Sequence, residues 1–293
     1  MNFRTLFADS CLVLCALFWG IGFVSMKDSL AFYPTWWLLS MRFGGGTLLM
    51  GACFYRRIAA SFKSGHAILD IASGATIGIF LFLGMGVQTL GLNFTGAGKQ
   101  AFLTAGYIVM VPLIIWAMSR KFPGWLCVAG SVICFAGMGL LTSDIADPLN
   151  IGDVLTIISA LFFAAQIIAI SRCALKSDPF VLTFWQFLVS LVCSLVLAFI
   201  FEGRFVWRGM DSLPDLLFIV FFCTFLCFTI QNVAQKHTSA AHAALLLGLE
   251  SVFGLLGGVF MLGEIFTSQM GLGCSLIFGA VLLVEVAPAF ARK

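Results

Sequence analysis

Ten apolar runs, most of them about twenty residues long, take up most of this chain, and no other sequence feature limits its fold as strongly. The hydrocarbon core of a bilayer is about 30 Å thick, and a helix of about 20 apolar residues crosses it. We therefore predict an all-α integral membrane protein with ten transmembrane helices. The predicted spans are residues 8–26, 34–54, 68–90, 97–118, 123–141, 152–171, 179–201, 213–234, 240–262 and 268–288.

The composition supports this class and argues against a soluble module. Hydrophobic residues make up 61% of the 293 residues and charged residues only 10%, whereas a soluble domain carries about 25% charged residues. The longest connections, residues 55–67 and 202–212, are too short to fold as domains. The ten cysteines fall almost wholly within apolar runs and lack the spacing of metal ligands, so we expect neither a metal site nor a cofactor.

Basic residues are distributed unevenly over the connections, and this distribution predicts the orientation. Cytoplasmic loops of membrane proteins are enriched in lysine and arginine. If the N-terminus is inside, eleven basic residues lie in cytoplasmic segments: Arg4, Arg56, Arg57, Lys63, Arg120, Lys121, Arg172, Lys176, Lys236, Arg292 and Lys293. Three lie in outer loops: Lys27, Arg204 and Arg208. We therefore predict a multi-pass protein of the plasma (inner) membrane with both termini in the cytoplasm, and attribute the net charge of +3 to topology rather than to a nucleic-acid partner.

The second half of the sequence resembles the first at a nearly constant offset of about 144 residues. "DSCLVLCALFW" from Asp9 aligns with "DVLTIISALFF" from Asp153, and "MRF" at 41–43 aligns with "WQF" at 185–187. At an offset of 143, "QTLGLNFTGAGKQAFL" aligns with "QNVAQKHTSAAHAALL", which places Lys99 opposite His242. Three short alignments in the same order indicate an internal repeat.

The two copies of this repeat must have opposite orientations, because five spans cross the membrane an odd number of times. We predict two inverted five-helix repeats, residues 1–145 and 146–293. Inverted repeats are typical of secondary transporters, in which two equivalent halves exchange conformations and open a central site to each side in turn.

The glycine-rich stretch "NFTGAGKQA" at 93–101 resembles two nucleotide-binding motifs but meets the requirements of neither. A phosphate loop needs glycine and serine or threonine where this chain has Asn93 and Gln100. A dinucleotide turn follows a strand, whereas this stretch lies between two apolar runs. We expect a tight hairpin instead, with Thr95 as the N-cap of the following helix and Thr238 as the cap of its repeat equivalent.

Five segments carry a family resemblance: "LFWGIGFVSMK" in the first span, "MRF" in the second, "GLNFTGAGKQAFLTAGYIVMVPL" through the fourth, "GDVLTIISALFFAAQ" in the sixth and "HAALLLGLESVFGLLGGVFMLGE" in the ninth. In this order they resemble the EamA-type branch of the drug/metabolite transporter superfamily. The resemblance implies ten helices in two inverted five-helix repeats and the movement of small organic solutes, often outward. One departure is that the Gly263-Glu264 end of the ninth span becomes Ser119-Arg120 in the fourth.

Ionisable and polar side chains inside the spans are the candidate site residues, because such groups are costly in a membrane and by default mark function. Arg42 lies about 12 Å into the second span, and its repeat partner Gln186 is also polar, so we expect both to face a cavity or a structural polar network. Glu250, in the middle of the ninth span, has either a cavity role or a structural hydrogen bond, and its counterpart is Tyr107. The other substrate-binding candidates are Gln166, Trp19 and Trp185.

Lys99 and His242 lie near helix ends and are candidates for gating or coupling. The alternative for Lys99 is an interfacial anchor. His242 is a candidate proton acceptor, because imidazole exchanges protons near physiological pH. Further gating candidates are amides that would be unfavourable in lipid: Gln88, Gln231 and Asn232.

Together these features predict a secondary transporter, with export as the expected direction. It would move small organic metabolites such as amino acids by alternating access through a central cavity. Expected partners are the small-molecule substrate and the lipid bilayer, and a coupling proton or counter-substrate and a homodimer are further candidates. The alternatives are a facilitative channel-like pore and a structural membrane protein. An intramembrane enzyme is not expected, because the chain lacks paired in-span aspartates, H-E-x-x-H and G-x-S-x-G.

Overall fold

The computed structural model describes residues 3–141, 148–207, 209–262 and 266–290, and these residues form helices and connections without a strand. Of the residues singled out above, five lie outside the described parts: Arg208, Gly263, Glu264, Arg292 and Lys293. The helices of the first half are α1 (Phe3–Phe32), α2 (Thr35–Lys63), α3 (Ala67–Leu92), α4 (Ala97–Thr104), α5 (Tyr107–Ser119) and α6 (Trp125–Leu141).

The second half repeats this order of elements. Its helices are α7 (Ile151–Cys173), α8 (Pro179–Phe201), α9 (Leu213–Phe218), the π-helical stretch η2 (Ile219–Leu226), α10 (Cys227–Ala234), α11 (Ala240–Leu247), α12 (Glu250–Leu262) and α13 (Ser268–Phe290). Helix occupies each of the ten predicted runs, as expected for segments that must pair their backbone polar groups internally in lipid. Within the described residues, six helical stretches are long and apolar enough to cross a membrane, and three more apolar helices are shorter.

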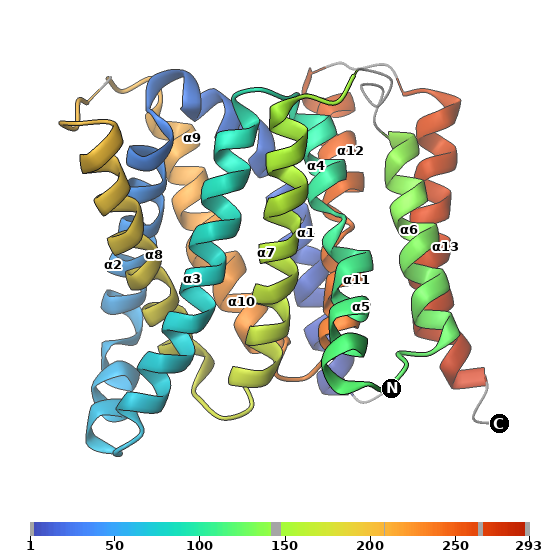
Figure 1. The fold of residues 1–293 in the computed structure, drawn as a ribbon, viewed down its shortest axis with the longest axis horizontal. Helices are drawn as coiled ribbons and strands as arrows, with labels where there is room; N and C mark the ends of the chain where they lie inside the picture. Colours follow the sequence, from blue (N-terminus) through green and yellow to red (C-terminus); the bar gives the residue numbers. More distant parts are fainter. Residues whose placement is uncertain (1–2, 142–147, 208, 263–265, 291–293) are drawn as a thin grey trace.

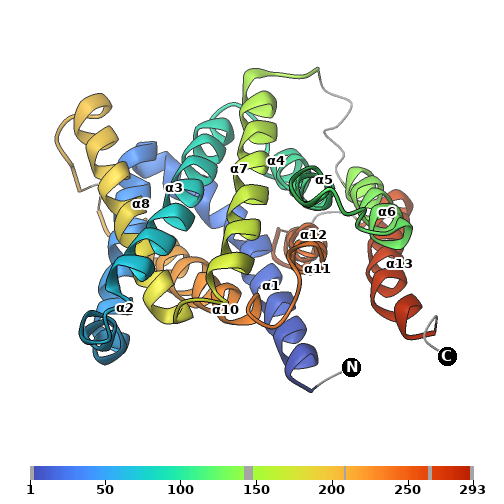
Figure 2. The ribbon, with the colours of Figure 1, turned by 60° about the horizontal axis from the view of Figure 1, so that its bottom comes forward.

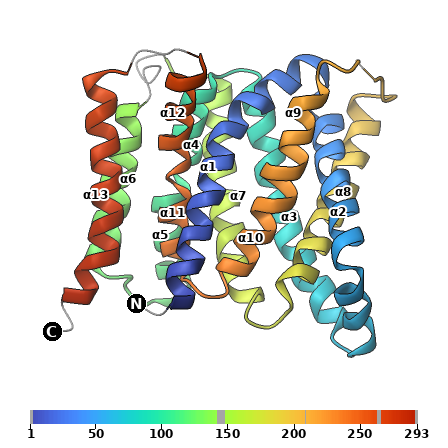
Figure 3. The ribbon, with the colours of Figure 1, turned by 180° about the vertical axis from the view of Figure 1, so that it is seen from behind.

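The helices stand roughly side by side, with two pairs at opposite ends of the molecule (Figure 1). At one end α2 packs against α8, and at the other α6 packs against α13 (Figure 2). The middle holds α1, α3, α7, α10 and the two broken spans α4/α5 and α11/α12, as the reverse view also shows (Figure 3). The start of α1, the end of α13 and the α10–α11 connection lie at the lower end of Figure 1, which we name the His242 end; the α3–α4 connection lies at the opposite, Lys99 end.

Glycines at the helix contacts allow the closest approaches. A Cβ atom on Gly78 of α3 would lie 2.7 Å from the carbonyl oxygen of Gln186 in α8, and one on Gly137 of α6 would lie 2.9 Å from that of Gly273 in α13. Helices in membranes associate mainly by such close van der Waals packing, because lipid removes the hydrophobic drive between them.

Two spans predicted as continuous are interrupted at equivalent places. The fourth breaks between α4 and α5 at Ala105 and Gly106, and the ninth breaks between α11 and α12 at Gly248 and Leu249, 143 residues later. At both breaks a tighter turn replaces part of the α-helical ladder, for example from the Ile108 amide to the Ala105 carbonyl at 2.9 Å. Such mid-helix turns often mark functional hinges.

The predicted threonine caps are wrong, because both helices begin one residue later. Gly96 is the N-cap of α4 and makes no side-chain cap, and Ser239 caps α11 by accepting from the amide of His242. The Thr95 hydroxyl instead donates to Oδ1 of Asp153 at 2.8 Å. The hairpin itself lies between α3 and α4 as predicted.

Candidate binding cavity

A cavity lies between the broken spans, with about 710 Å³ of empty space when its opening to solvent is included. Its walls come from both halves: α1, α2, α3 and the α4/α5 break from the first, and α7, η2, α10 and the α11/α12 break from the second. Five predicted substrate-binding residues line it (Trp19, Arg42, Tyr107, Gln166 and Glu250), as do two predicted gating residues (Gln88 and Gln231).

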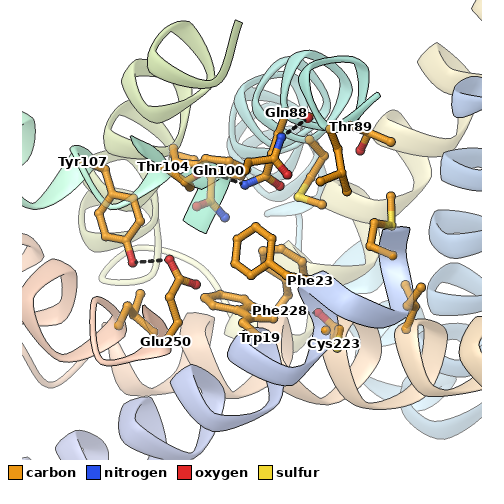
Figure 4. Close-up of a pocket in the computed structure, with 18 of the residues that line it drawn as sticks. Trp19, Phe23, Gln88, Thr89, Gln100, Thr104, Tyr107, Cys223, Phe228 and Glu250 are labelled. Carbon is orange, nitrogen blue, oxygen red and sulfur yellow. Dashed lines mark hydrogen bonds between the residues drawn. The ribbon is translucent and has the colours of Figure 1, made fainter. Parts of the chain in front are cut away.

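Tyr107 and Glu250 meet where the two broken spans cross (Figure 4). Each is the first residue of the second half-helix of its broken span, α5 or α12, and each is only 4% exposed. The Tyr107 hydroxyl donates to Oε1 of Glu250 at 3.1 Å. The start of a helix carries partial positive charge and favours an acidic group in its first turn, so the break itself helps to hold Glu250 inside the protein.

Arg42 reaches the cavity from α2 and is 5% exposed. Its Nε donates to Oγ1 of Thr224 at 2.6 Å and Nη2 donates to the Cys223 carbonyl at 3.3 Å, both in η2. That carbonyl also accepts from Nε1 of Trp19 at 2.8 Å. Among the described residues, no carboxylate lies within 4.0 Å of Arg42. The guanidinium therefore stands at the cavity wall with neutral partners, next to a π-helical stretch of the kind found at functional sites.

Aromatic side chains form an apolar wall beside these polar groups. The rings of Trp19 and Phe228 lie 5.0 Å apart between centroids, and Phe23 stands next to them in the cavity (Figure 4). The cavity thus combines a cation, a carboxyl group and an aromatic surface, an arrangement suited to an amphipathic ligand.

Amides and a hydroxyl line the cavity toward the Lys99 end. Nε2 of Gln88 donates to Oγ1 of Thr104 at 3.0 Å, and Nε2 of Gln100 donates to the Gln88 carbonyl at 2.6 Å (Figure 4). Deeper in the molecule, Nε2 of Gln166 donates to Oε1 of Gln231 at 3.4 Å and links α7 to α10. Gln88 and Gln231 are repeat equivalents, but Gln88 pairs with Thr104 of its own half and Gln231 pairs with Gln166, so their polar contacts differ.

Five predicted site residues do not line the cavity: Gln186, Asn232, Trp185, Lys99 and His242. Nδ2 of Asn232 donates to Oε1 of Gln186 and to Oγ1 of Thr183, each at 2.9 Å, so both amides belong to a buried network between α8 and α10. This is the structural alternative that the sequence left open for Gln186. Trp185 packs against Gly74 of α3, where a Cβ atom would clash with its side chain, and does not line the cavity.

Lys99 and His242 each face an aspartate of the other half. Nζ of Lys99 lies 2.8 Å from Oδ2 of Asp153, with side-chain exposures of 5% and 0%. Nε2 of His242 lies 3.3 Å from Oδ1 of Asp9, with exposures of 17% and 9%. The burial of Lys99 is at odds with an interfacial anchor. Sequence reasoning aligned Asp9 with Asp153 but did not single out either one, because both stand near the start of a span where an acidic residue is common.

Comparisons with known proteins are consistent over the whole chain. A model of the EamA-like transporter family matches residues 6–143 and 150–286. An uncharacterized transporter from Archaeoglobus fulgidus is 34% identical over 283 residues, covering 97% of this chain and 87% of the relative. Uncharacterized transporter YoaV from Bacillus subtilis is 24% identical over 281 residues, covering 91% and 92%. A solved structure described as "Crystal structure of protein" has a TM-score of 0.77 at 16% identity, covering 98% of this chain and 99% of that one, which shows a similar fold.

Proposed function

The chain belongs to the EamA-like transporter family, and from this premise we propose that it is a secondary transporter of small organic metabolites, such as amino acids, working by alternating access through the central cavity. Export is the proposed direction. We also propose that ten helices cross the plasma membrane in two inverted five-helix repeats, residues 1–145 and 146–293, with both termini in the cytoplasm.

The meeting of Tyr107 with Glu250 carries this proposal. The two residues are repeat equivalents, 143 positions apart, and each begins the second half of a broken span. Substrate sites of inverted-repeat transporters lie where discontinuous helices of the two repeats meet. A contact between equivalent residues at such a crossing is expected on the axis that relates two inverted halves.

The helix contacts support the same relation. If the two halves are exchanged, the contact of α3 with α7 corresponds to that of α10 with α1. The contact of α5 with α7 likewise corresponds to that of α12 with α1, and all four contacts are present. The two separate matches of the family model, to 6–143 and 150–286, are further support.

The cavity wall supports the substrate class. Arg42 has neutral protein partners and is placed to receive an anionic group such as a carboxylate. Glu250 has the neutral hydroxyl of Tyr107 as its partner and is placed to receive a cationic or hydrogen-bond-donating group. Trp19 and Phe228 supply the surface for an apolar part of the substrate.

Coupling to a proton or a counter-substrate is part of the proposal, with His242 and Glu250 as candidate proton carriers. A homodimer is a further candidate for the assembly.

Counterflow in sealed proteoliposomes tests this function. We expect saturable uptake of a labelled amino acid that unlabelled substrate inside the vesicles accelerates, whereas ohmic conductance without saturation would identify a channel-like pore. Arg42→Ala and Glu250→Gln should each lower counterflow, and the matched control Arg57→Ala, at an exposed arginine of α2, should leave it unchanged. If both cavity variants transport normally, the site assignment is wrong.

A further inference from the structure

Two equivalent contacts join the repeats at opposite ends of the molecule. Lys99 of α4 holds Asp153 of α7 at the Lys99 end, and His242 of α11 holds Asp9 of α1 at the His242 end. The basic residues are repeat equivalents at an offset of 143, and the aspartates at an offset of 144. Each contact therefore connects a broken span of one half with the first span of the other.

The two contacts differ in geometry. The Lys99–Asp153 pair is short, at 2.8 Å, and almost fully buried. The Thr95 hydroxyl and the amide of Asn150 also donate to Asp153, at 2.8 and 2.9 Å, and the Asn150 contact belongs to the capping box of α7. The His242–Asp9 contact is longer, at 3.3 Å, and more exposed. Two equivalent contacts thus occur in one tight and one loose form.

The lining of the cavity is also asymmetric, and it extends toward the Lys99 end, where the tighter contact lies. Three residues line it toward the Lys99 end: Thr89, Leu92 and Gln100. Their repeat equivalents toward the His242 end are equally buried but do not line it: Asn232, Gln235 and Ala243. The described structure is therefore one of two arrangements that an inverted repeat allows, with the cavity displaced toward the Lys99 end.

We propose that Asp153 and Asp9 are positioning residues that set which face the cavity opens to, each by holding the basic residue of the opposite repeat. When the repeats exchange conformations, the tight geometry passes to Asp9 and His242, and the loose geometry passes to Asp153 and Lys99. The inference rests on the alternating access proposed above. Removing a carboxylate leaves a basic group without that partner, which costs more where the contact is tight and buried than where it is loose. Each removal therefore disfavours one arrangement relative to the other.

Labelling of a cavity thiol from the two faces tests this inference. Ile167 lines the cavity from α7, and Ile167→Cys supplies a thiol whose modification by a membrane-impermeant maleimide is read by mass spectrometry, which separates it from the native cysteines. Right-side-out and inverted vesicles expose opposite faces. Arg204→Cys and Lys176→Cys, at exposed connections of the Lys99 end and the His242 end, identify the face presented.

The ratio of the labelling rate from the Lys99 face to that from the His242 face is the readout. Asp153→Asn, which keeps an oxygen acceptor for the capping box, should lower this ratio about tenfold, the change that about 1.4 kcal/mol produces. Asp9→Asn should raise it by a similar factor. Asp178→Asn is the matched control, since Asp178 also accepts at a helix start but pairs with an exposed arginine; it should leave the ratio unchanged.

A purely structural role would lower stability without moving the ratio. Equal ratios in all variants, or shifts in the same direction for Asp153→Asn and Asp9→Asn, overturn the inference. If Asp153→Asn does not fold, Thr95→Val removes one donor to the same carboxylate and should lower the ratio by a smaller factor. Counterflow by the wild-type protein is measured separately, so its absence would count against the transport function, whereas normal counterflow with an unmoved ratio would count against the aspartates alone.

Discussion

Gly20→Ala should destabilise the protein and disturb the cavity, because α1 and α12 touch backbone to backbone at this position. A Cβ atom on Gly20 would lie 2.5 Å from the carbonyl oxygen of Glu250 and 2.7 Å from the amide nitrogen of Gly254, whereas ordinary contact begins at 3.4 Å. Backbone atoms of a helix have no rotamer to change. The two helices would have to separate by roughly 1 Å, since protein interiors have no spare space to absorb the methyl group.

Overpacking of this kind typically costs about 1–3 kcal/mol. The repeat equivalents of Gly20 and Gly254 are Ala164 and Val111, so the corresponding α7–α5 contact already accommodates side chains. The effect should therefore be specific to the α1–α12 side. Because the clash is with the Glu250 carbonyl, the shift also displaces the Glu250 carboxyl group relative to the Tyr107 hydroxyl, and transport should fall together with stability.

Unfolding in mixed micelles gives the change in free energy, and counterflow gives the change in transport. Gly279→Ala is the control, because a Cβ atom on this glycine of α13 meets nothing within 4 Å; it should be neutral or stabilising by about 0.5–1 kcal/mol, the usual gain of alanine over glycine within a helix. A Gly20→Ala protein as stable and active as the wild type would refute the reasoning.

Three further predictions follow from single residues. Tyr107→Phe removes the hydroxyl that Glu250 accepts from; leaving a buried carboxyl group without this donor should cost about 1–3 kcal/mol of stability, measured by unfolding in micelles, and should weaken ligand binding measured by calorimetry. Arg120→Gly should raise the apparent melting temperature, since Arg120 ends α5 at a φ of 54°, where a residue with a Cβ atom pays roughly 1–2 kcal/mol. Arg57→Ala should change stability by less than about 1 kcal/mol in the same unfolding assay, because its pair with Asp178 is half-exposed.

The sequence predicted several of the polar residues that line the cavity, but not all of them. Arg42, Glu250 and Tyr107 were identifiable because a polar side chain within an apolar run is costly, whichever helices surround it. Gln186 and Trp185 carried the same signal but face α3 and α10 instead of the cavity. Gln100, Thr104 and Phe228 line the cavity without having been predicted. Threonine and phenylalanine are common in spans of every kind, and Gln100 stands in the stretch 93–101 that was interpreted only as a hairpin.

The helical segments and their order follow from the sequence alone, since hydrophobicity over about twenty residues is a local property and the repeat offset is visible by alignment. The breaks at Ala105–Gly106 and Gly248–Leu249, and the pairing of Lys99 with Asp153 and of His242 with Asp9, were decided by the tertiary structure. The reason is physical. Which carboxylate a basic residue pairs with depends on which helices lie side by side, and where a helix breaks depends on the helix that crosses it there. Neither choice is recorded in the local pattern of apolar and polar residues.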